Sequence, residues 1–433
     1  MTEQTPYSVN LSPEKAKELA ESGGALLLLD VPAGTIVGID QQTFIVGPKF
    51  KGVKMLPPGP HFMSCNATRH GGNGGGGPDF APTMGFFTHV APRSVVVRRW
   101  DPHEELLLPI QDDEEVGRLA AGVRRFEFDA YLAPYDLSSF ATWQRLSNHI
   151  SAGVIERLSP VAGGNICVTA EADPFLLGPR TAAETRLADQ LASKEALQED
   201  AQAASEAGEA AEARNGQAGA SASGQLPVPA AAKGVGRCYY TRLPRHAKVA
   251  GLTPQELTQL NMDKTRLLDT LIADEYGGNA DIMLGELQFA FLAFLLGHSL
   301  QAFGQWKALL HLALACEEAP LQTRPRFYAD LLAAVHAQLD HCLAAGRGPG
   351  ASQPSPLGLP MTEELLADSF LKRLFARFYD MLHTAGGSVN PQLQQAEARR
   401  LQQTLEAGMG WDFSIGELAG ESDDEDAPVV VEL

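Results

Sequence analysis

Histidine and cysteine are the residues of this chain best suited to metal or redox chemistry, but their spacing matches no common type of site. The eleven histidines contain no His-Glu-x-x-His pair, the arrangement that places two zinc ligands on one face of a helix. His336 and His341 are five positions apart, or about 500° around a helix, so they do not share a face. We therefore expect no metal and no cofactor.

The five cysteines lead to the same expectation. They form no Cys-x-x-Cys pair and are odd in number, at Cys65, Cys167, Cys238, Cys316 and Cys342. This pattern indicates neither a zinc site nor a disulfide framework.

Three further groups of residues have types that suit chemistry, and each also has a plainer explanation. The glycines at 71–77 are followed by Pro78 and Asp79, not by the Lys-Ser/Thr ending of a phosphate-binding loop. The acids of QDDEE (111–115) suit acid–base work or magnesium, but acids in the first turn of a helix also stabilise its dipole. A stripe of aromatic residues suits a ligand pocket or a core, at Phe289, Phe291, Phe294, Phe303 and Trp306. Since no Gly-x-Ser-x-Gly motif occurs either, we predict that the protein is not an enzyme.

Charge and hydropathy restrict the partners. The chain has 433 residues, a formal net charge of -19 and no basic run longer than a pair. Nucleic-acid binding depends on clustered Lys and Arg, so direct contact with nucleic acid is not expected, and a basic protein surface is the easier partner. The N-terminus is polar and acidic, and the longest apolar run, 287–296, is shorter than the ~20 residues of a membrane helix. We expect a soluble protein of a reducing, intracellular compartment.

The chain divides by composition into five parts. After an N-terminal segment (1–24), residues 25–170 contain short apolar runs with turn residues every eight to twelve positions, which predicts an antiparallel β-sandwich or barrel-like domain with flanking helices. Asp112 with Glu115 predicts a capped helix, and 140–158 predicts a second amphipathic helix. Residues 171–237 form a low-complexity linker, rich in Ala, Glu, Ser and Gly between about 182 and 233, which buries too little apolar surface to order itself.

Helical periodicity begins at Thr253, the expected cap of a helix over 253–272. The run 280–297 is apolar on all sides, which predicts a central, buried helix. More amphipathic helices follow, so 238–410 is expected to be an all-α domain.

The last part, 411–433, is an acidic tail that ends in three valines. ESDDED precedes APVVVEL, and valine runs favour β-strands, although no sheet follows in the chain. Ser422 has Glu425 three positions later, the pattern of an acidophilic kinase site, while a plain solvated acidic tail explains the same residues.

Two long stretches also carry a family resemblance. They are VPAGTIVGIDQQTFIVGPKFKGVKMLPPGPHF (31–62) and LGELQFAFLAFLLGHSLQAFGQWKALLHL (284–312), and the chain closes with APVVVEL. With MGFF (84–87) and RW (99–100), these stretches closely resemble the Aar-two family of splicing factors, assembly chaperones of the U-five small nuclear ribonucleoprotein. The resemblance covers about 25–165 and 238–433.

The resemblance implies a β-rich N-terminal domain and a C-terminal α-helical domain of superhelical, VHS-like kind. It implies a partner too, the large scaffold protein of the particle (a pre-mRNA-processing splicing factor), bound through its RNase-H-like and Jab/MPN-like domains. The family holds this scaffold in a precursor particle and excludes the helicase until maturation. The family's tail adds a bridging strand, a role that corresponds here to Val429, Val430, Val431, Glu432 and Leu433. We expect the protein in the cytoplasm and nucleus, without membrane contact.

The chain departs from the family pattern in its Ala/Glu-rich linker and in its glycine-rich loop at 69–82. Insertions in surface segments are tolerated, so neither departure changes the assignment. The alternative is a helical-repeat adaptor that binds peptides and is unrelated to splicing. That alternative predicts a repeat near 34 residues, which the sequence does not contain.

Overall fold

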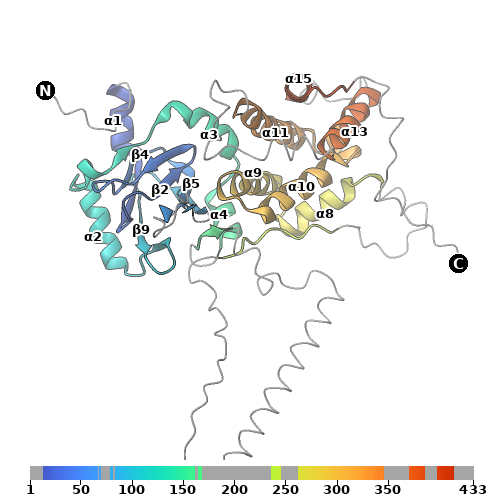
Figure 1. Cartoon of the computed structure of the whole chain (residues 1–433). Coiled ribbons are helices and arrows are strands. Elements are labelled where there is room, and N and C mark those ends of the chain that lie inside the picture. The colour runs from blue at the N-terminus through green and yellow to red at the C-terminus, as the bar shows by residue number, and fades with distance from the viewer. Residues whose placement is uncertain are drawn as a thin grey trace, which may run out of the picture.

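The computed structural model describes residues 13–66, 68–69, 79–80, 83–160, 164–167, 236–244, 262–345, 370–385 and 397–413. Its elements form successive layers, shown in Figure 1: helix α2 (Asp113–Arg124), two β-sheets, and a helical part that begins at α8 (Thr265–Glu275). A short helix, α1 (Pro13–Ser22), precedes the first strand. The predicted division into a two-sheet N-terminal region and a helical C-terminal region is confirmed. The predicted linker lies almost wholly outside the described residues.

Two five-stranded sheets form the N-terminal part. The first has the order β10 (Leu106–Pro109), β9 (Val95–Asp101), β1 (Gly24–Leu29), β4 (Gly52–Leu56) and β11 (Ala133–Pro134). The second has the order β12 (Ile166–Cys167), β8 (Met84–Val90), β5 (Gly59–Asn66), β2 (Ile36–Ile39) and β3 (Gln42–Ile45). A two-residue pair, β6 (Thr68–Arg69) with β7 (Asp79–Phe80), stands apart.

The sheets pack face to face around one apolar core. Leu26 of β1 and Val53 of β4 belong to the same buried cluster as Val37 of β2 and Met63 of β5. Alternate residues of each strand point into this core, as in other sandwiches. The pairing is not wholly antiparallel, because β1 pairs in parallel with β9, and β11 with β4. Strand β1 is buried along nearly its whole length, which is the usual character of a central strand with parallel pairing.

Helix α2 covers the outer face of the first sheet, and its start was predicted correctly. The Asp112 carboxylate accepts hydrogen bonds from the backbone N–H groups of Glu114 and Glu115. Glu115 does not close the expected capping box with the cap residue; its carboxylate binds Arg99 of β9 at 2.8 Å. The side chain therefore joins the helix to the sheet.

The predicted helix over 140–158 is two helices, α3 (Phe140–Ser147) and α4 (Ala152–Leu158). The break follows from two local bonds. Ser151 caps α4 by accepting from the N–H of Val154, and the N–H of His149 is bonded to a side chain of the helical part. The expectation of a single helix was wrong because a tertiary contact takes the backbone group that helix continuation needs.

The helical part is built around α9 (Ala280–Gly297), which is buried along most of its length, as predicted. It is long and apolar enough to cross a membrane by those two criteria, but 83% of it is buried inside the rest of the chain. Around it lie α8, α10 (Leu300–Leu314), the short π-helix η4 (Ala319–Thr323), α11 (Pro325–Ala345), α13 (Phe370–Ala385) and α15 (Glu397–Met409). The expected break after Gly297 is present, with His298 in the left-handed conformation.

The helix predicted over 253–272 is not continuous in its described part. A new helix, α8, begins at Thr265, because the Asp263 carboxylate accepts from the N–H of Thr265 at 2.9 Å. The same carboxylate accepts from the N–H of Glu317 at 2.9 Å, so it joins the start of α8 to the turn after α10. The predicted cap Thr253 lies outside the described residues.

A buried charged group holds the sandwich at Asp40, after β2. The Asp40 carboxylate accepts from His61 Nδ1 at 2.7 Å and from the Tyr135 hydroxyl at 2.7 Å. His61 Nε2 lies 2.7 Å from the carbonyl oxygen of Pro57, so both ring nitrogens donate and the imidazole is protonated. Burial alone lowers the pKa of His61, but the charge and hydrogen bond of Asp40, with the Pro57 bond, raise it above 6.5.

We expect Asp40→Asn to lower the free energy of unfolding by about 3–5 kcal/mol, because it leaves a buried imidazolium without its counter-charge. Asn keeps the left-handed backbone of Asp40 (φ 53°). The contribution of His61 is full below pH 6.5 and is lost as the pH rises through its raised folded pKa. Urea unfolding from pH 6 to 9 therefore shows stability falling with pH in the wild type, and Asp40→Asn removes this slope. Asp30→Asn, at another left-handed but exposed aspartate, is the control, and an equal effect there would contradict the prediction.

Candidate functional site

The residues predicted to bind a partner, Val429 to Leu433, and the kinase-type Ser422 lie outside the described residues. The structure does describe residues 410–413, which precede this tail in the chain. Helix α15 ends at Met409, and Gly410 follows it with a φ of 67°, so that the chain turns toward α13. Phe413 is 7% exposed, and its ring lies 5.1 Å from that of Tyr379 on α13.

We call residues 410–413 the tail root. Tyr379 also donates a hydrogen bond to the carbonyl oxygen of Ala398 at 2.9 Å, which ties α13 to α15 directly behind Phe413. The root therefore packs on α13 at a point that is itself bonded to α15.

The second structural feature of functional interest is the joint between the β-sandwich and the helical part. Gln288 of α9 is fully buried. Its Oε1 accepts from the N–H of His149 at 2.8 Å, and its Nε2 donates to Asn148 Oδ1 at 2.7 Å. A glycine is required beside it, because a Cβ on Gly285 would lie 2.5 Å from the carbonyl oxygen of His149. The LGELQ stretch therefore fits the turn between α3 and α4 through Gly285 and Gln288.

Glu286 makes the joint on another side of α9. Its carboxylate is fully buried and accepts from the Thr241 N–H at 2.8 Å, the Thr241 hydroxyl at 2.7 Å and Gln305 Nε2 at 2.8 Å. Arg157 of α4 donates to the same hydroxyl at 2.8 Å. It also lies over the Tyr276 ring, 4.8 Å from its centre. The Glu286 carboxylate is thus enclosed by hydrogen bonds that link α9 with α10 and, through Thr241 of the segment 236–244, with α4.

Aromatic packing completes the joint. Phe87 of β8 stacks on Phe289 of α9 with ring centres 4.0 Å apart, and Phe62 of β5 meets Phe87 edge-on at 4.8 Å. The rest of the predicted aromatic stripe packs on itself, as Phe294 with Phe303 at 4.5 Å and Phe291 with Trp306 at 5.9 Å. The stripe is core and not the wall of a pocket.

The residues screened for chemistry are dispersed in the fold. His336 contacts the Thr404 hydroxyl at 3.0 Å, while His341 lies near Gln41. Within the part of the chain that the structure describes, no three His, Cys, Asp or Glu side chains are placed to hold a metal. Burial raises the pKa of the Cys316 and Cys342 thiols to about 12, so these cysteines are poor nucleophiles. Among the described residues, the screened histidines and cysteines are therefore buried or held apart and do not gather at one site.

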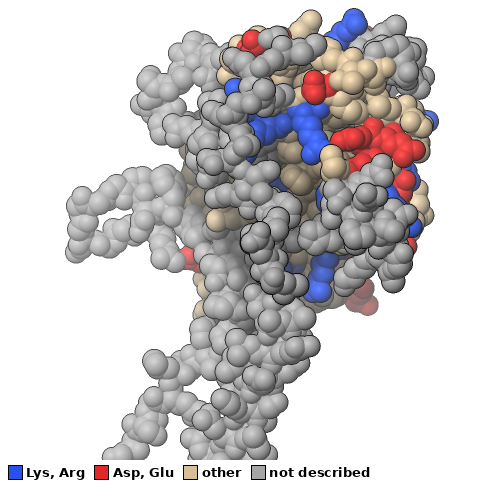
Figure 2. Space-filling model, turned by 90° about the vertical axis from the view of Figure 1, so that its right-hand side faces the viewer, with Lys and Arg blue, Asp and Glu red and all other residues tan. Residues whose placement is uncertain are grey.

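Charges on the helical end are mixed in sign. Figure 2 looks onto this end and shows basic and acidic groups side by side on its described surface. Ion pairs of these helices include Arg377 with Glu317 at 3.0 Å and Arg324 with Asp269 at 2.5 Å. Such a surface suits protein contacts more than a phosphate backbone.

Both parts of the chain that meet at this joint match family models. Residues 22–160 match the AAR2 N-terminal domain, and residues 240–414 match the AAR2 C-terminal repeat region. The chain belongs to the AAR2 family. It is similar to the proteins named Protein AAR2 homolog of mouse (31% identity over 428 residues) and human (30% over 427), with 98% of each chain covered. It is also similar to that of Caenorhabditis elegans, at 26% identity over 93% of this chain and 98% of the relative.

The predicted family resemblance is thereby confirmed. In this AAR2 family member the two stretches that carried it have structural roles. The first, 31–62, contains Asp40 and His61 of the buried charged group. The second, 284–312, contains Gly285, Glu286 and Gln288 of the joint. Periodicity had indicated only a buried helix here, and the signal for a joint was the pair of polar residues inside an apolar run.

We expect Gln288→Leu to lower the free energy of unfolding by about 2–3 kcal/mol, because it leaves the His149 N–H and the Asn148 side chain without their partner. Leu is close to Gln in volume, so packing loss contributes little. Urea unfolding measures the change. Gln403→Leu, the same substitution at an exposed position of α15, is the control, and equal unfolding curves for the two variants would show that the joint carries no such energy.

Proposed function

We propose that the protein is a non-enzymatic assembly factor for the splicing machinery. Its partner is the large scaffold protein of the U-five small nuclear ribonucleoprotein, bound through the scaffold's RNase-H-like and Jab/MPN-like domains. It holds the scaffold in a precursor particle and excludes the helicase until maturation, and it is located in the cytoplasm and nucleus. AAR2 family membership over nearly the whole chain is the observation that carries this proposal.

The proposed mechanism is stoichiometric and uses two contacts. One scaffold domain docks on the folded part, and the residues Val429–Leu433 add a strand to another scaffold domain. Strand addition provides main-chain hydrogen bonds, and alternate side chains enter pockets of the receiving sheet. A strand of five residues binds weakly alone, so its contribution depends on the tether.

The fixed tail root makes the tether effective. Val429 is sixteen positions after Phe413, so the strand can reach at most about 55 Å from the root. Confinement of this kind raises the effective concentration of the second contact to roughly the millimolar range. The joint at Gln288 and Glu286 also helps, because it fixes the position of the β-sandwich relative to the helices that hold the tail root.

The acids of ESDDED suit a tail that must stay extended until it binds. Like charges in series repel one another and disfavour collapse. They also discourage pairing of the valine strand with other copies of the chain.

The helical-repeat adaptor remains the second candidate. The matching family model is described as a repeat region, and α9 and α10 pack as consecutive helices joined by two residues, His298 and Ser299. An adaptor of this kind binds peptides through the helical part alone. Affinity purification from nuclear and cytoplasmic extracts separates the two, because only the assembly factor recovers the scaffold protein, and without the helicase.

Removal of Ala427–Leu433 is expected to weaken scaffold binding at least ~10-fold, or about 1.4 kcal/mol. Isothermal calorimetry with the two purified scaffold domains measures it. Val430→Pro provides a finer test, because proline removes a ladder N–H without changing tail length or charge. Val430→Thr keeps both the N–H and β-branching and is the control. Unchanged affinity after the deletion would refute the role of the tail.

Phosphorylation of Ser422 is proposed as a release signal. It adds between one and two negative charges beside acids that are already present. We expect the Ser422-phosphorylated protein to bind the scaffold more weakly, with the difference shrinking as salt rises, because exposed charges are screened. Calorimetry at two salt concentrations, with Ser422→Ala treated by the same kinase as control, checks this. Equal affinity of the two forms leaves the tail acids with a solubilising role alone.

A further inference from the structure

A cavity of about 720 Å³ lies on the β-sandwich, at the end of the first sheet where β1 begins. Its walls come from α1, the bulged end of β4, the turn before β9 and the residues after α2. Figure 1 places these elements at the opposite end of the molecule from α13 and α15, which hold the tail root. The cavity is therefore separate from the contact proposed for the tail.

Three bulky residues that line the cavity have left-handed backbones, which normally favour glycine. They are Met55 (φ 63°), Arg93 (φ 60°) and Phe126 (φ 64°). Met55 is the extra residue of a bulge, since Gly24 pairs with Leu56 and Ala25 with Lys54. Bulges and left-handed residues concentrate where a side chain must be aimed at a ligand.

Phe126 is the most informative of the three. It follows α2 at the position where helices commonly place glycine: Glu127 N–H binds the Gly122 carbonyl at 3.0 Å, and Phe126 N–H binds that of Val123 at 3.0 Å. These two bonds define the Schellman motif. A phenylalanine there is strained, and it buries little, because 67% of it is exposed. The Phe126 side chain therefore does not stabilise the fold, and glycine at this position is expected to make the protein more stable.

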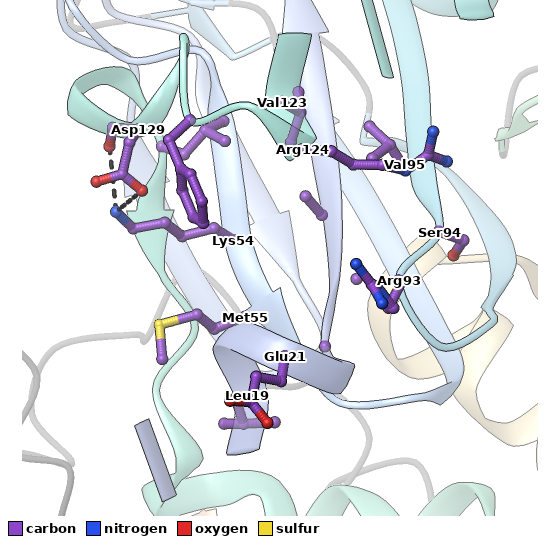
Figure 3. Close-up of a pocket in the computed structure, with 15 residues that line it drawn as sticks. Leu19, Glu21, Lys54, Met55, Arg93, Ser94, Val95, Val123, Arg124 and Asp129 are labelled. Carbon is purple, nitrogen blue, oxygen red and sulfur yellow. Dashed lines mark hydrogen bonds and ion pairs between the residues drawn. The ribbon is translucent and has the colours of Figure 1, made fainter. Parts of the chain in front are cut away.

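The charges of the cavity are divided between its sides. Lys54 Nζ and Asp129 neutralise each other at 2.5 Å. Figure 3 shows this pair on one side and Arg93 and Arg124 on the other, next to Ser94 and Val95. Among the described residues, neither arginine side chain has a hydrogen-bond or ion-pair partner. Glu21 of α1 is the remaining acid in the lining, so the free groups carry one more positive than negative charge.

The floor between the two sides is apolar. Leu19 and Leu132 are buried there, and Val95 and Val123 contribute partly buried side chains. An exposed aromatic residue at the rim with free arginines is the composition of protein-binding hot spots. A phosphate backbone fits poorly, because Glu21 and Asp129 would lie against it.

We propose that this cavity docks a short extended segment of a partner protein in which an acidic side chain stands next to a large apolar one. The acid pairs with Arg93 and Arg124, in the bidentate manner that guanidinium groups favour. The apolar side chain covers the floor and packs on Phe126 and Met55. This site is independent of the tail and of the scaffold contact proposed above.

The test uses the full-length protein and a fluorescein-labelled peptide, GEDLFEELFG, which shares no run with the chain's own tail, in a polarisation assay at about 0.15 M salt, where repulsion by the net charge is screened beyond ~8 Å. Phe126→Gly is expected to raise the urea midpoint of unfolding and to lower the affinity for the peptide at least tenfold. A fold-stabilising change that removes binding cannot act through damage to the fold. The double variant Arg93→Gln with Arg124→Gln is expected to lower the affinity for this peptide at least tenfold. Its affinity for the analogue in which Asn and Gln replace the peptide's Asp and Glu is expected to stay unchanged.

Arg118→Gln, on the exposed face of the same helix α2, is the matched control and leaves binding unchanged. The proposal is overturned if the peptide does not bind, or if Phe126→Gly binds it as well as the wild type. It is also overturned if removal of residues 414–433 tightens peptide binding fivefold, since the chain's own tail is then the occupant. A change of oligomeric state in Phe126→Gly by sedimentation would likewise replace the partner with a second copy.

Discussion

The burial of α9 on all sides is the constraint on which the rest of the structure depends. A helix with leucine, phenylalanine and alanine around its whole circumference must be covered everywhere, and neither part of the chain covers it alone. The second β-sheet and α4 cover one side through Phe62, Phe87 and Val154, and the surrounding helices cover the others. The two parts therefore share one core, although they lie far apart in the sequence. This hydrophobic requirement is non-directional, so it decides that the parts meet but not how they are oriented.

The polar side chains inside that core supply the orientation. Gln288 and Glu286 are buried in a region where an unpaired amide or carboxylate is costly. Gln288 bonds to the backbone of His149 on the sandwich side, and Glu286 bonds to Thr241, whose hydroxyl also accepts from Arg157 of α4. Such bonds are satisfied in only one alignment of the two parts. Asp40 and His61 act in the same way inside the sandwich. The result is a frame from which both a folded surface and a tail root can be presented at a set separation, as the proposed two-contact mechanism requires.

Much of the local structure followed from residue patterns. The cap at Asp112, the strand-rich region, the fully apolar helix and its break at Gly297 are governed by neighbours a few positions away, so a linear reading finds them. The errors arose where a distant residue competed for a local group. Glu115 bonds to Arg99 instead of closing its capping box, and Gln288 takes the N–H that would have continued the helix through His149. The parallel pairing of β1 with β9 was missed for the same reason, because register between distant strands leaves no local signal.

By itself the sequence determined the class of each region, the family, and the acidic tail with its terminal valines, because composition, periodicity and long motifs are properties of the linear chain. Tertiary structure alone decided that Gln288 bonds to His149 while Glu286 bonds to Thr241, and where the tail root is held. It also decided that Met55, Arg93 and Phe126 meet at one cavity. These three residues come from three separate segments, and each is unremarkable in its own stretch of sequence. Their common feature is a left-handed backbone at a bulge, a turn and a helix end. Their meeting at one cavity depends on strand pairing and helix packing that form only when the whole domain has folded.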